Sequence, residues 1–230
     1  MTRLINASLF SGYMICPSLY FYRYIKKYYQ ILNFKNQESE RGDLIHKLID
    51  AHFQEIPVKN QFLDSDVKIK SWWNYYLENF LPKNQEKVYS EWSFNVPIQT
   101  PLEKIVLTGR IDRVIYDNDK ITLINWKSNQ RKTRFDLYNF NLQMEFYAYA
   151  FSKIEEIESL ELKLVFLDLK EASSRILKKA DLEKIEDKIF QMIENTHPLI
   201  KTYIPDPVML DTDIPACKAC DFFSFCEKLL

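Results

Sequence analysis

The strongest constraint on the fold is a pair of apolar segments that flank a short turn. Residues 109–114 (GRIDRV) and 124–127 (INWK) lie on either side of residues 117–120 (DNDK), a run of turn formers. The Val, Ile and Leu residues around the turn predict a β-hairpin. If Asn118-Asp119 is a two-residue turn, Asp112 faces Asn125 with Cβ atoms about 5 Å apart. Lys127, two residues further, shares the face of Asn125.

This spacing suggests a particular chemistry. Asp112 and Asn125 offer oxygen ligands for a hard cation such as Mg²⁺, and Lys127 adds an ammonium on the same face. Such a lysine can orient an attacking water or stabilise the charge of a phosphate. The hairpin therefore predicts a metal-dependent phosphodiesterase site, although the same pattern fits a hairpin with no catalytic role.

The composition is that of an ordinary globular protein. The chain has 230 residues, of which 47% are hydrophobic and 27% charged, and this is enough for one sizeable core. Its net charge of −1 means that any nucleic-acid footprint must be a local patch. The sequence has neither an apolar run long enough to span a bilayer nor a recognisable secretion signal. We therefore expect a cytoplasmic protein with no membrane partner.

The order of elements predicts one α+β domain over residues 1–230. Helical spacing is found at 7–29 (with a break at Cys16-Pro17), 42–53, 67–80, 137–151 and 182–193, and strand patterns at 88–96, 105–116, 121–127 and 160–169. Residues 33–39 are polar and predict a loop, and Ile176 is predicted to close a short hairpin. This order favours a small mixed sheet flanked by helices.

The cysteines predict a metal site. Cys217, Cys220 and Cys226 form a C-x₂-C-x₅-C cluster near the C-terminus, and Cys16 lies close to the N-terminus. In a chain without a secretion signal, this spacing favours metal ligation over disulfides. Structural zinc and an iron–sulfur cluster remain alternatives, because spacing alone does not separate them.

Taken together, these motifs resemble the RecB-like branch of the PD-(D/E)XK nuclease superfamily, from Cys16 to Cys226. The short length is most similar to the stand-alone CRISPR-associated iron–sulfur exonucleases. The resemblance implies a restriction-endonuclease-like core with a helical N-terminal part. It also implies an AddB-like [4Fe–4S] cluster on Cys16, Cys217, Cys220 and Cys226 that joins the two chain ends.

The resemblance also assigns roles to individual residues. Mg²⁺ or Mn²⁺ would be bound by Asp112, by His46 in RGDLIH and by Glu91. The alternative for Glu91 is a solvated strand residue with no ligand. Lys127 would be catalytic, and Gln143 and Tyr147, four apart on one helix face, would position substrate or the lysine. The implied activity is a deoxyribonuclease for single-stranded DNA or overhangs, acting alongside the CRISPR integrase.

Asn125 departs from the family pattern, which has Asp-x-Lys on this strand. An amide oxygen can bind a metal but contributes no negative charge. Three explanations compete: an engineered inactive variant, a natural protein whose nuclease has decayed, or a weak site that also uses the Trp126 carbonyl. The rivals to a nuclease are a non-catalytic DNA-binding subunit and a zinc-stabilised interaction module.

A DNA track is expected from local basic residues. Arg23 and Lys26 lie on the first predicted helix, Arg131 and Lys132 follow Lys127, and Arg110 shares the face of Asp112. Their mixture with Tyr and Phe suits single-stranded nucleic acid, with cations on phosphates and rings on bases. The alternative is that these basic residues lie on an ordinary solvated surface and bind no nucleic acid.

Overall fold

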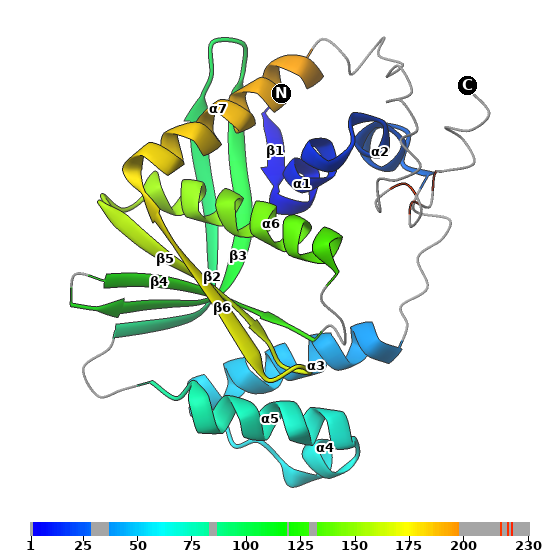
Figure 1. Ribbon diagram of the computed structural model, residues 1–230, viewed down its shortest axis with the longest axis vertical. Coiled ribbons are helices and arrows are strands. Elements are labelled where there is room, and N and C mark those ends of the chain that lie inside the picture. Colours follow the sequence, from blue (N-terminus) through cyan, green and yellow to red (C-terminus); the bar gives the residue numbers. More distant parts are fainter. Residues whose placement is uncertain are drawn as a thin grey trace.

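A computed structural model of the chain describes residues 2–28, 37–82, 87–118, 120–128, 133–197, 217, 220 and 222. Within this part, a mixed sheet lies between two layers of helices (Figure 1). The strands are β1 (Arg3–Asn6), β2 (Lys87–Gln99), β3 (Lys104–Asp117), β4 (Lys120–Lys127), β5 (Ser159–Phe166) and β6 (Glu171–Lys178). The predicted α+β class, a small mixed central sheet with flanking helices, is confirmed.

The helices are α1 (Ala7–Ile15), α2 (Pro17–Tyr20), the π-helix η1 (Phe21–Ile25), α3 (Gln37–Phe53), α4 (Asn60–Asp64), α5 (Val67–Asn79), α6 (Arg134–Ser152) and α7 (Lys179–Thr196). The break predicted at Cys16-Pro17 is confirmed, since Cys16 has extended backbone and Pro17 begins α2. The loop predicted over 33–39 is wrong at its end, where α3 begins at Gln37 with two acidic residues in its first turn.

The long strand β3 organises the sheet. β2 pairs with it antiparallel over nearly its whole length, so one edge of β3 is occupied. The other edge is shared: residues 105–108 pair in parallel with β1, and residues 113–117 pair antiparallel with β4. Between these two ladders, residues 109–112 have no strand partner on that edge among the described residues. The sheet therefore splits at residues 109–112 (the GRID segment), as the two groups of strands in Figure 1 illustrate.

The predicted hairpin register is confirmed. Asp117 pairs with Lys120 and Arg113 with Ile124, so Asp112 and Asn125 are the next opposed positions. The ladder itself ends one residue short of them, because the Trp126 N–H donates to the Asp112 carboxylate at 2.7 Å. Beyond the hairpin, β4 pairs in parallel with β5, and β5 antiparallel with β6.

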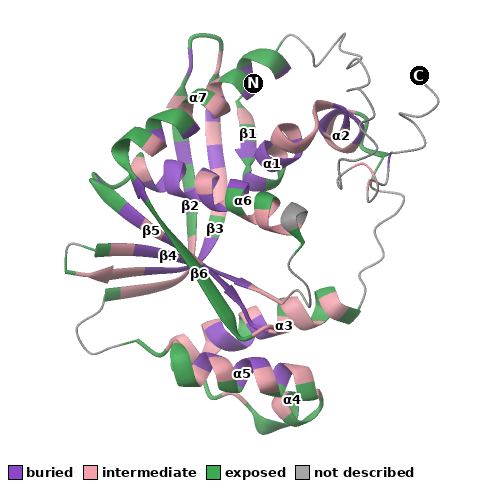
Figure 2. Cartoon of the chain, in the orientation of Figure 1, coloured by how far each residue is buried: buried purple, intermediate pink, exposed green. Residues whose placement is uncertain are grey.

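Successive side chains of each strand point to opposite faces of the sheet, and this divides the core into two layers. Leu123 and Val114 pack against α1, α6 and α7, whereas Ile124 and Trp126 pack against α3 and α5. Burial is concentrated in the middle strands, and β6 is exposed along most of its length (Figure 2). Asn125 and Lys127 have the parity of Leu123, and this directs both side chains toward α6.

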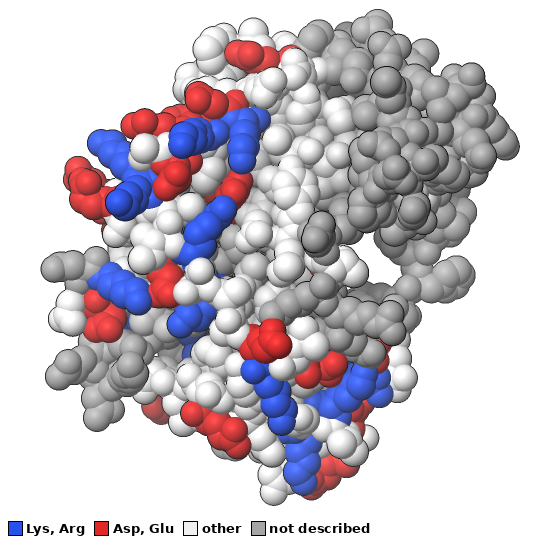
Figure 3. All heavy atoms as spheres, viewed as in Figure 1, with Lys and Arg blue, Asp and Glu red and all other residues white. Residues whose placement is uncertain are grey.

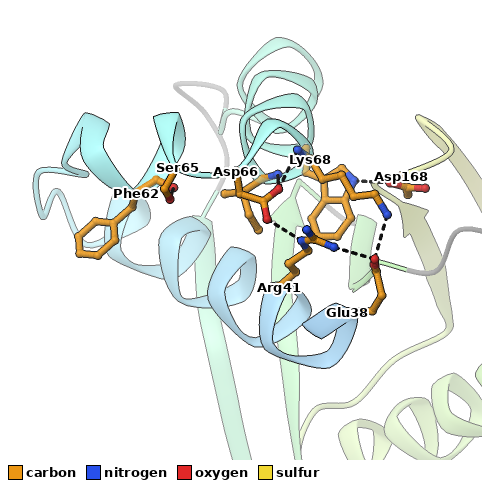
Figure 4. A network of polar contacts seen from close by, with 9 residues as sticks. Glu38, Arg41, Phe62, Ser65, Asp66, Lys68 and Asp168 are labelled. Carbon is orange, nitrogen blue, oxygen red and sulfur yellow. Dashed lines mark hydrogen bonds and ion pairs between the residues drawn. The ribbon is translucent and has the colours of Figure 1, made fainter. Parts of the chain in front are cut away.

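A polar network fixes α3 against α5 (Figure 4). Asp66 caps α5 by accepting from the backbone N–H of Lys68 at 2.9 Å, and its other oxygen binds Arg41 Nε of α3 at 2.6 Å. Glu38 accepts from both Arg41 and Lys68. Because Arg41 is five residues before His46, this network holds the part of α3 that carries the histidine.

A small cluster joins the two ends of the chain. Phe222 packs against Phe21 and Tyr22 of η1, and the ring centroids of Tyr22 and Phe222 are 5.8 Å apart. Cys220 packs on the same cluster. Cys220 and Phe222 are therefore in contact with the N-terminal helical part of the chain. No helix among the described residues is long and apolar enough to cross a membrane.

Candidate functional site

The split in the sheet opens into a cleft of about 750 Å³. Its walls come from α3, β2, β3, β4 and α6, and they include His46, Glu91, Arg110, Asp112, Asn125, Trp126, Lys127, Gln143 and Tyr147. Every residue predicted to bind Mg²⁺ or Mn²⁺ or to take part in catalysis thus lies around a single cavity. Segments distant in the sequence reach it because β3 leaves β1 and joins β4 at residues 109–112.

Three of these residues form a possible metal site. One ligand atom from each of His46, Glu91 and Asp112 lies within 4.8 Å of the other two. His46 Nδ1 is 3.5 Å from Asp112 Oδ1. Burial alone would lower the pKa of His46, but the hydrogen bond and charge of Asp112 outweigh it and raise that pKa. An imidazole and two carboxylates are a suitable donor set for Mg²⁺ or Mn²⁺.

Glu91 reaches this group through an unusual backbone conformation. Its φ of 50° lies in the left-handed region, which is rare for a residue inside a strand. Burial raises the pKa of Glu91, and the nearby Asp112 carboxylate raises it further. Its Oε2 atom is 2.6 Å from Arg110 Nε, yet this atom is buried and accepts no hydrogen bond from the described residues. A bound metal ion would give this oxygen a better-directed partner than the Arg110 guanidinium.

Asn125 occupies the centre of the site and is buried. A carboxylate can only accept hydrogen bonds, so the amide nitrogen of Asn125 must face Asp112. In this orientation the nitrogen donates to both Asp112 oxygens, and the amide oxygen accepts from Lys127 Nζ at 2.9 Å. The amide oxygen then lies 3.0 Å from Gln143 Oε1, and both oxygens accept from the Lys127 ammonium. The opposite orientation lets the nitrogen donate to Gln143 Oε1 at 3.0 Å but sets two oxygens against each other at Asp112.

Lys127 is enclosed by α6. Its Nζ donates to Gln143 Oε1 at 2.7 Å and lies 4.5 Å from the centroid of the Phe140 ring. Gln143 in turn donates to the Tyr147 hydroxyl at 3.0 Å. Burial lowers the pKa of Lys127 to about 8, with the charge of Asp112 acting in the other direction. Gln143 and Tyr147 therefore form a hydrogen-bonded chain that ends at the Lys127 ammonium.

Glycine at position 109 lets α6 approach this closely. A Cβ at Gly109 would lie 2.5 Å from Phe94 Cζ and 3.0 Å from Tyr147 Cε1. Any other residue there would have to displace the Phe94 ring of β2 and would also crowd the Tyr147 ring of α6. The close packing of both rings over β3 thus requires glycine at the first residue of the GRID segment.

Other predictions fare differently. The described backbone contact of Trp126 is its N–H to Asp112, and the carbonyl ligand stays a prediction. Of the predicted DNA contacts, Arg110 lines the cleft, whereas Arg23 and Lys26 belong to η1 and its end and are not among the lining residues. Arg131, Lys132 and Cys226 lie outside the described residues. Figure 3 shows Lys and Arg mixed with Asp and Glu on the face of α7 and α5.

The sequence reasoning missed part of the cleft wall. Asp43, Lys47 and Asp50 of α3 also line it, and Asp50 has a buried Oδ1 with no hydrogen bond from the described residues. The signal was present, because Asp43, His46 and Asp50 recur at helical spacing and must share one face of α3.

Comparison with known proteins identifies the superfamily of this chain. Residues 5–227 match the PD-(D/E)XK nuclease superfamily, so nearly the whole chain belongs to it. Solved structures also match, among them one titled "Crystal structure of SSO0001", with 16% sequence identity, a TM-score of 0.46, and coverage of 100% of this chain and 88% of that one. Among curated proteins, no sequence matches that of this chain.

Proposed function

We propose that this chain is a divalent-metal-dependent deoxyribonuclease of the RecB-like branch, acting on single-stranded DNA or overhangs. The observation that carries the proposal is the meeting of His46, Glu91 and Asp112 with Lys127 in one cleft. This arrangement places a candidate cation site beside a buried amine, and membership of the nuclease superfamily makes a phosphodiester the natural substrate.

In this proposal each residue has a distinct role. His46, Glu91 and Asp112 would hold the metal. The Trp126 carbonyl would be a weaker ligand, and so would the Asn125 amide oxygen once the amide turns away from Lys127. When bound, the metal supplies Lewis-acid polarisation of the phosphate and a more acidic water. Lys127 orients that water or stabilises the transition-state charge, while Gln143 and Tyr147 hold Lys127 in place.

The decisive experiment compares this chain with Asn125→Asp for Mn²⁺-dependent cleavage of end-labelled single-stranded DNA. We expect slow cleavage by this chain and faster cleavage by the variant, because the acid adds a negative ligand. Lys127→Ala, in either background, should abolish cleavage without loss of the fold. Absence of cleavage by both proteins, with DNA still bound, would contradict the catalytic proposal.

That last outcome would favour a second candidate, a non-catalytic DNA-binding subunit. The specific observation behind it is Asn125 itself, whose amide already bridges Asp112 and Lys127 without any metal. Under this alternative the cleft binds a DNA backbone through Arg110 and Lys127 and performs no hydrolysis, even after Asn125→Asp.

The cysteines belong to the proposal as a structural [4Fe–4S] cluster on Cys16, Cys217, Cys220 and Cys226. The contact of Cys220 with the Phe21, Tyr22 and Phe222 cluster suits a site that joins the chain ends. A broad visible absorption band, with iron and sulfide in the purified protein, would support it. A colourless protein that contains zinc would favour the zinc-stabilised alternative instead. Assistance to the CRISPR integrase is the proposed biological setting.

A further inference from the structure

Arg110 and Glu91 come from neighbouring strands and meet at the mouth of the cleft. Arg110 is opposite Ser93 in the β2–β3 ladder, so its side chain must lean along the strand to reach Glu91. The resulting ion pair has an Nε–Oε2 distance of 2.6 Å. The Arg110 side chain is 63% exposed, whereas that of Glu91 is 17% exposed. One partner thus faces solvent and the other faces the interior of the site.

The Glu91 carboxylate is needed in two places. It is one of the three groups close enough to share a cation with His46 and Asp112. It is also the charge partner of Arg110, although the guanidinium N–H is not directed at Oε2. A poorly directed ion pair at a half-open site contributes little free energy, and a better ligand can replace it.

Two cations already compensate the two acids of the trio, while Asp43, Lys47 and Asp50 add further charges to the cleft wall. Glu91 and Asp112 are the acids of the trio, and Arg110 and Lys127 are the cations that neutralise them, with Asn125 contributing no charge. A divalent cation that enters this arrangement meets two fixed positive charges at short range. Metal binding therefore becomes favourable when one of these cations is moved or neutralised.

A phosphodiester can draw the Arg110 guanidinium away from Glu91 and neutralise its charge. The ion pair uses Nε, and a guanidinium can also present its terminal nitrogens to a phosphate in a bidentate arrangement. Because Arg110 is exposed and lines the cleft, a bound DNA backbone could reach it without moving the strands. The guanidinium would then turn outward and leave Glu91 to the metal.

We propose that Arg110 couples substrate binding to metal binding: it neutralises Glu91 in the free protein, and a phosphodiester that takes over its guanidinium releases Glu91 as a metal ligand. This inference rests on the proposed function and adds its order of assembly. The free protein binds metal weakly, and the metal site becomes complete only when DNA is present. Such a device would restrict hydrolytic chemistry to the loaded cleft.

The test measures Mn²⁺ affinity by electron paramagnetic resonance of free Mn²⁺, with and without a single-stranded phosphorothioate oligonucleotide that resists cleavage. We expect the oligonucleotide to tighten Mn²⁺ binding about tenfold, a coupling typical of linked sites. By reciprocity, Mn²⁺ should tighten oligonucleotide binding by the same factor. In Arg110→Ala, the free protein should bind Mn²⁺ about tenfold tighter than the parent, and the oligonucleotide should add little more.

Lys47→Ala is the matched control, because Lys47 is an exposed cation of the same cleft wall. It removes one positive charge but leaves the Arg110–Glu91 pair, so the coupling should persist. Equal Mn²⁺ affinities for Arg110→Ala and Lys47→Ala, with unchanged coupling, would overturn the inference while leaving the metal site intact. Failure of every protein to bind Mn²⁺, even with DNA, would instead overturn the metal site and the coupling together.

Discussion

The Asn125 amide bridges Asp112 and Lys127, with its nitrogen toward the carboxylate and its oxygen 2.9 Å from the ammonium. In this position the two amide hydrogens place partial positive charge beside the Asp112 carboxylate. A cation bound between two carboxylates has the same electrostatic effect. The Asp112 carboxylate is thus hydrogen-bonded by the Asn125 amide as well as by the Trp126 N–H. An acid at the same position would set two buried carboxylates against each other.

This arrangement predicts that Asn125→Asp has opposite effects on stability and on metal binding. Without metal, the variant should lose about 2 kcal/mol of unfolding free energy, because one of two adjacent buried acids must become protonated or remain repelled. With Mn²⁺ it should recover that loss, and its Mn²⁺ affinity should exceed that of the parent. Urea denaturation in EDTA and in Mn²⁺ measures both effects.

Asn125→Ala serves as the control for this prediction, since it removes the amide without adding a charge. It should also be less stable than the parent in EDTA, but Mn²⁺ should not restore its stability. Equal stability of Asn125→Asp and the parent in EDTA would show that the amide bridge is not the feature that stabilises the site.

Gly109→Ala tests the close approach of α6 to β3. The new methyl group would overlap the Phe94 ring and touch Tyr147, and both rings are buried. We expect a loss of about 1–3 kcal/mol, as for other overpacked cores. Gly42→Ala is the contrasting variant, because its Cβ meets only the rotatable Ser128 hydroxyl, at 2.8 Å. Since Gly42 is inside α3, that variant should be neutral or slightly stabilising.

Denaturation curves of the two glycine variants show why Gly109→Ala is destabilising. The cause is either the overlap with the Phe94 ring or a general destabilisation by alanine at glycine positions. Phe94→Leu, which shortens the obstructing ring, should reduce the additional cost of Gly109→Ala in a double-mutant cycle, with a coupling of about 1 kcal/mol. Additive effects of the two changes would mean that the Phe94 ring does not determine the requirement for glycine.

The sequence predicted the hairpin better than any other part of the fold. Turn residues at 117–120 and alternating apolar residues are local signals, and they specify the observed register. β1 was missed because it is only four residues long and pairs in parallel with β3, about a hundred residues away. Such pairing leaves no periodic pattern in a short segment.

The same distinction holds for the site. Asp112, Asn125 and Lys127 could be placed from the hairpin alone, whereas His46 and Glu91 depended on a family resemblance. Nothing local indicates that Glu91 adopts left-handed backbone or that it pairs with Arg110. Arg113 is a further example, since its buried guanidinium donates to the Phe80 carbonyl and the Tyr76 hydroxyl, a set of partners that only tertiary packing assembles.

The backbone of Glu91 leads to a comparison of two variants. Glu91→Gly and Glu91→Ala both remove the carboxylate, so both should weaken Mn²⁺ binding to the same extent. Glycine adopts a φ of 50° without strain, whereas alanine does not. The Gly variant should therefore be more stable than the Ala variant by about 1 kcal/mol, the reverse of the usual order in strands. Equal stabilities would indicate that the strand relaxes when the carboxylate is lost.

The Asp66 cap predicts a dependence of stability on pH. Burial alone would raise the pKa of Asp66, but hydrogen bonds from Arg41 and from the backbone N–H groups of Ile69 and Lys68 outweigh it and lower that pKa. A carboxyl whose pKa is lower in the folded state contributes stability above its unfolded value near 4, and loses it as the pH falls through the folded value.

Asp66→Asn isolates this contribution, because asparagine also caps helices but carries no charge. At pH 7 the parent should be more stable than the variant by up to about 1 kcal/mol, since the ion pair with Arg41 is partly exposed to solvent. The difference should shrink as the pH falls below about 4, where the parent carboxyl begins to bind a proton. Urea denaturation of both proteins across this range measures it. A difference that stays constant with pH would assign the stabilisation to cap geometry rather than to the charge that holds α3, and with it His46, against α5.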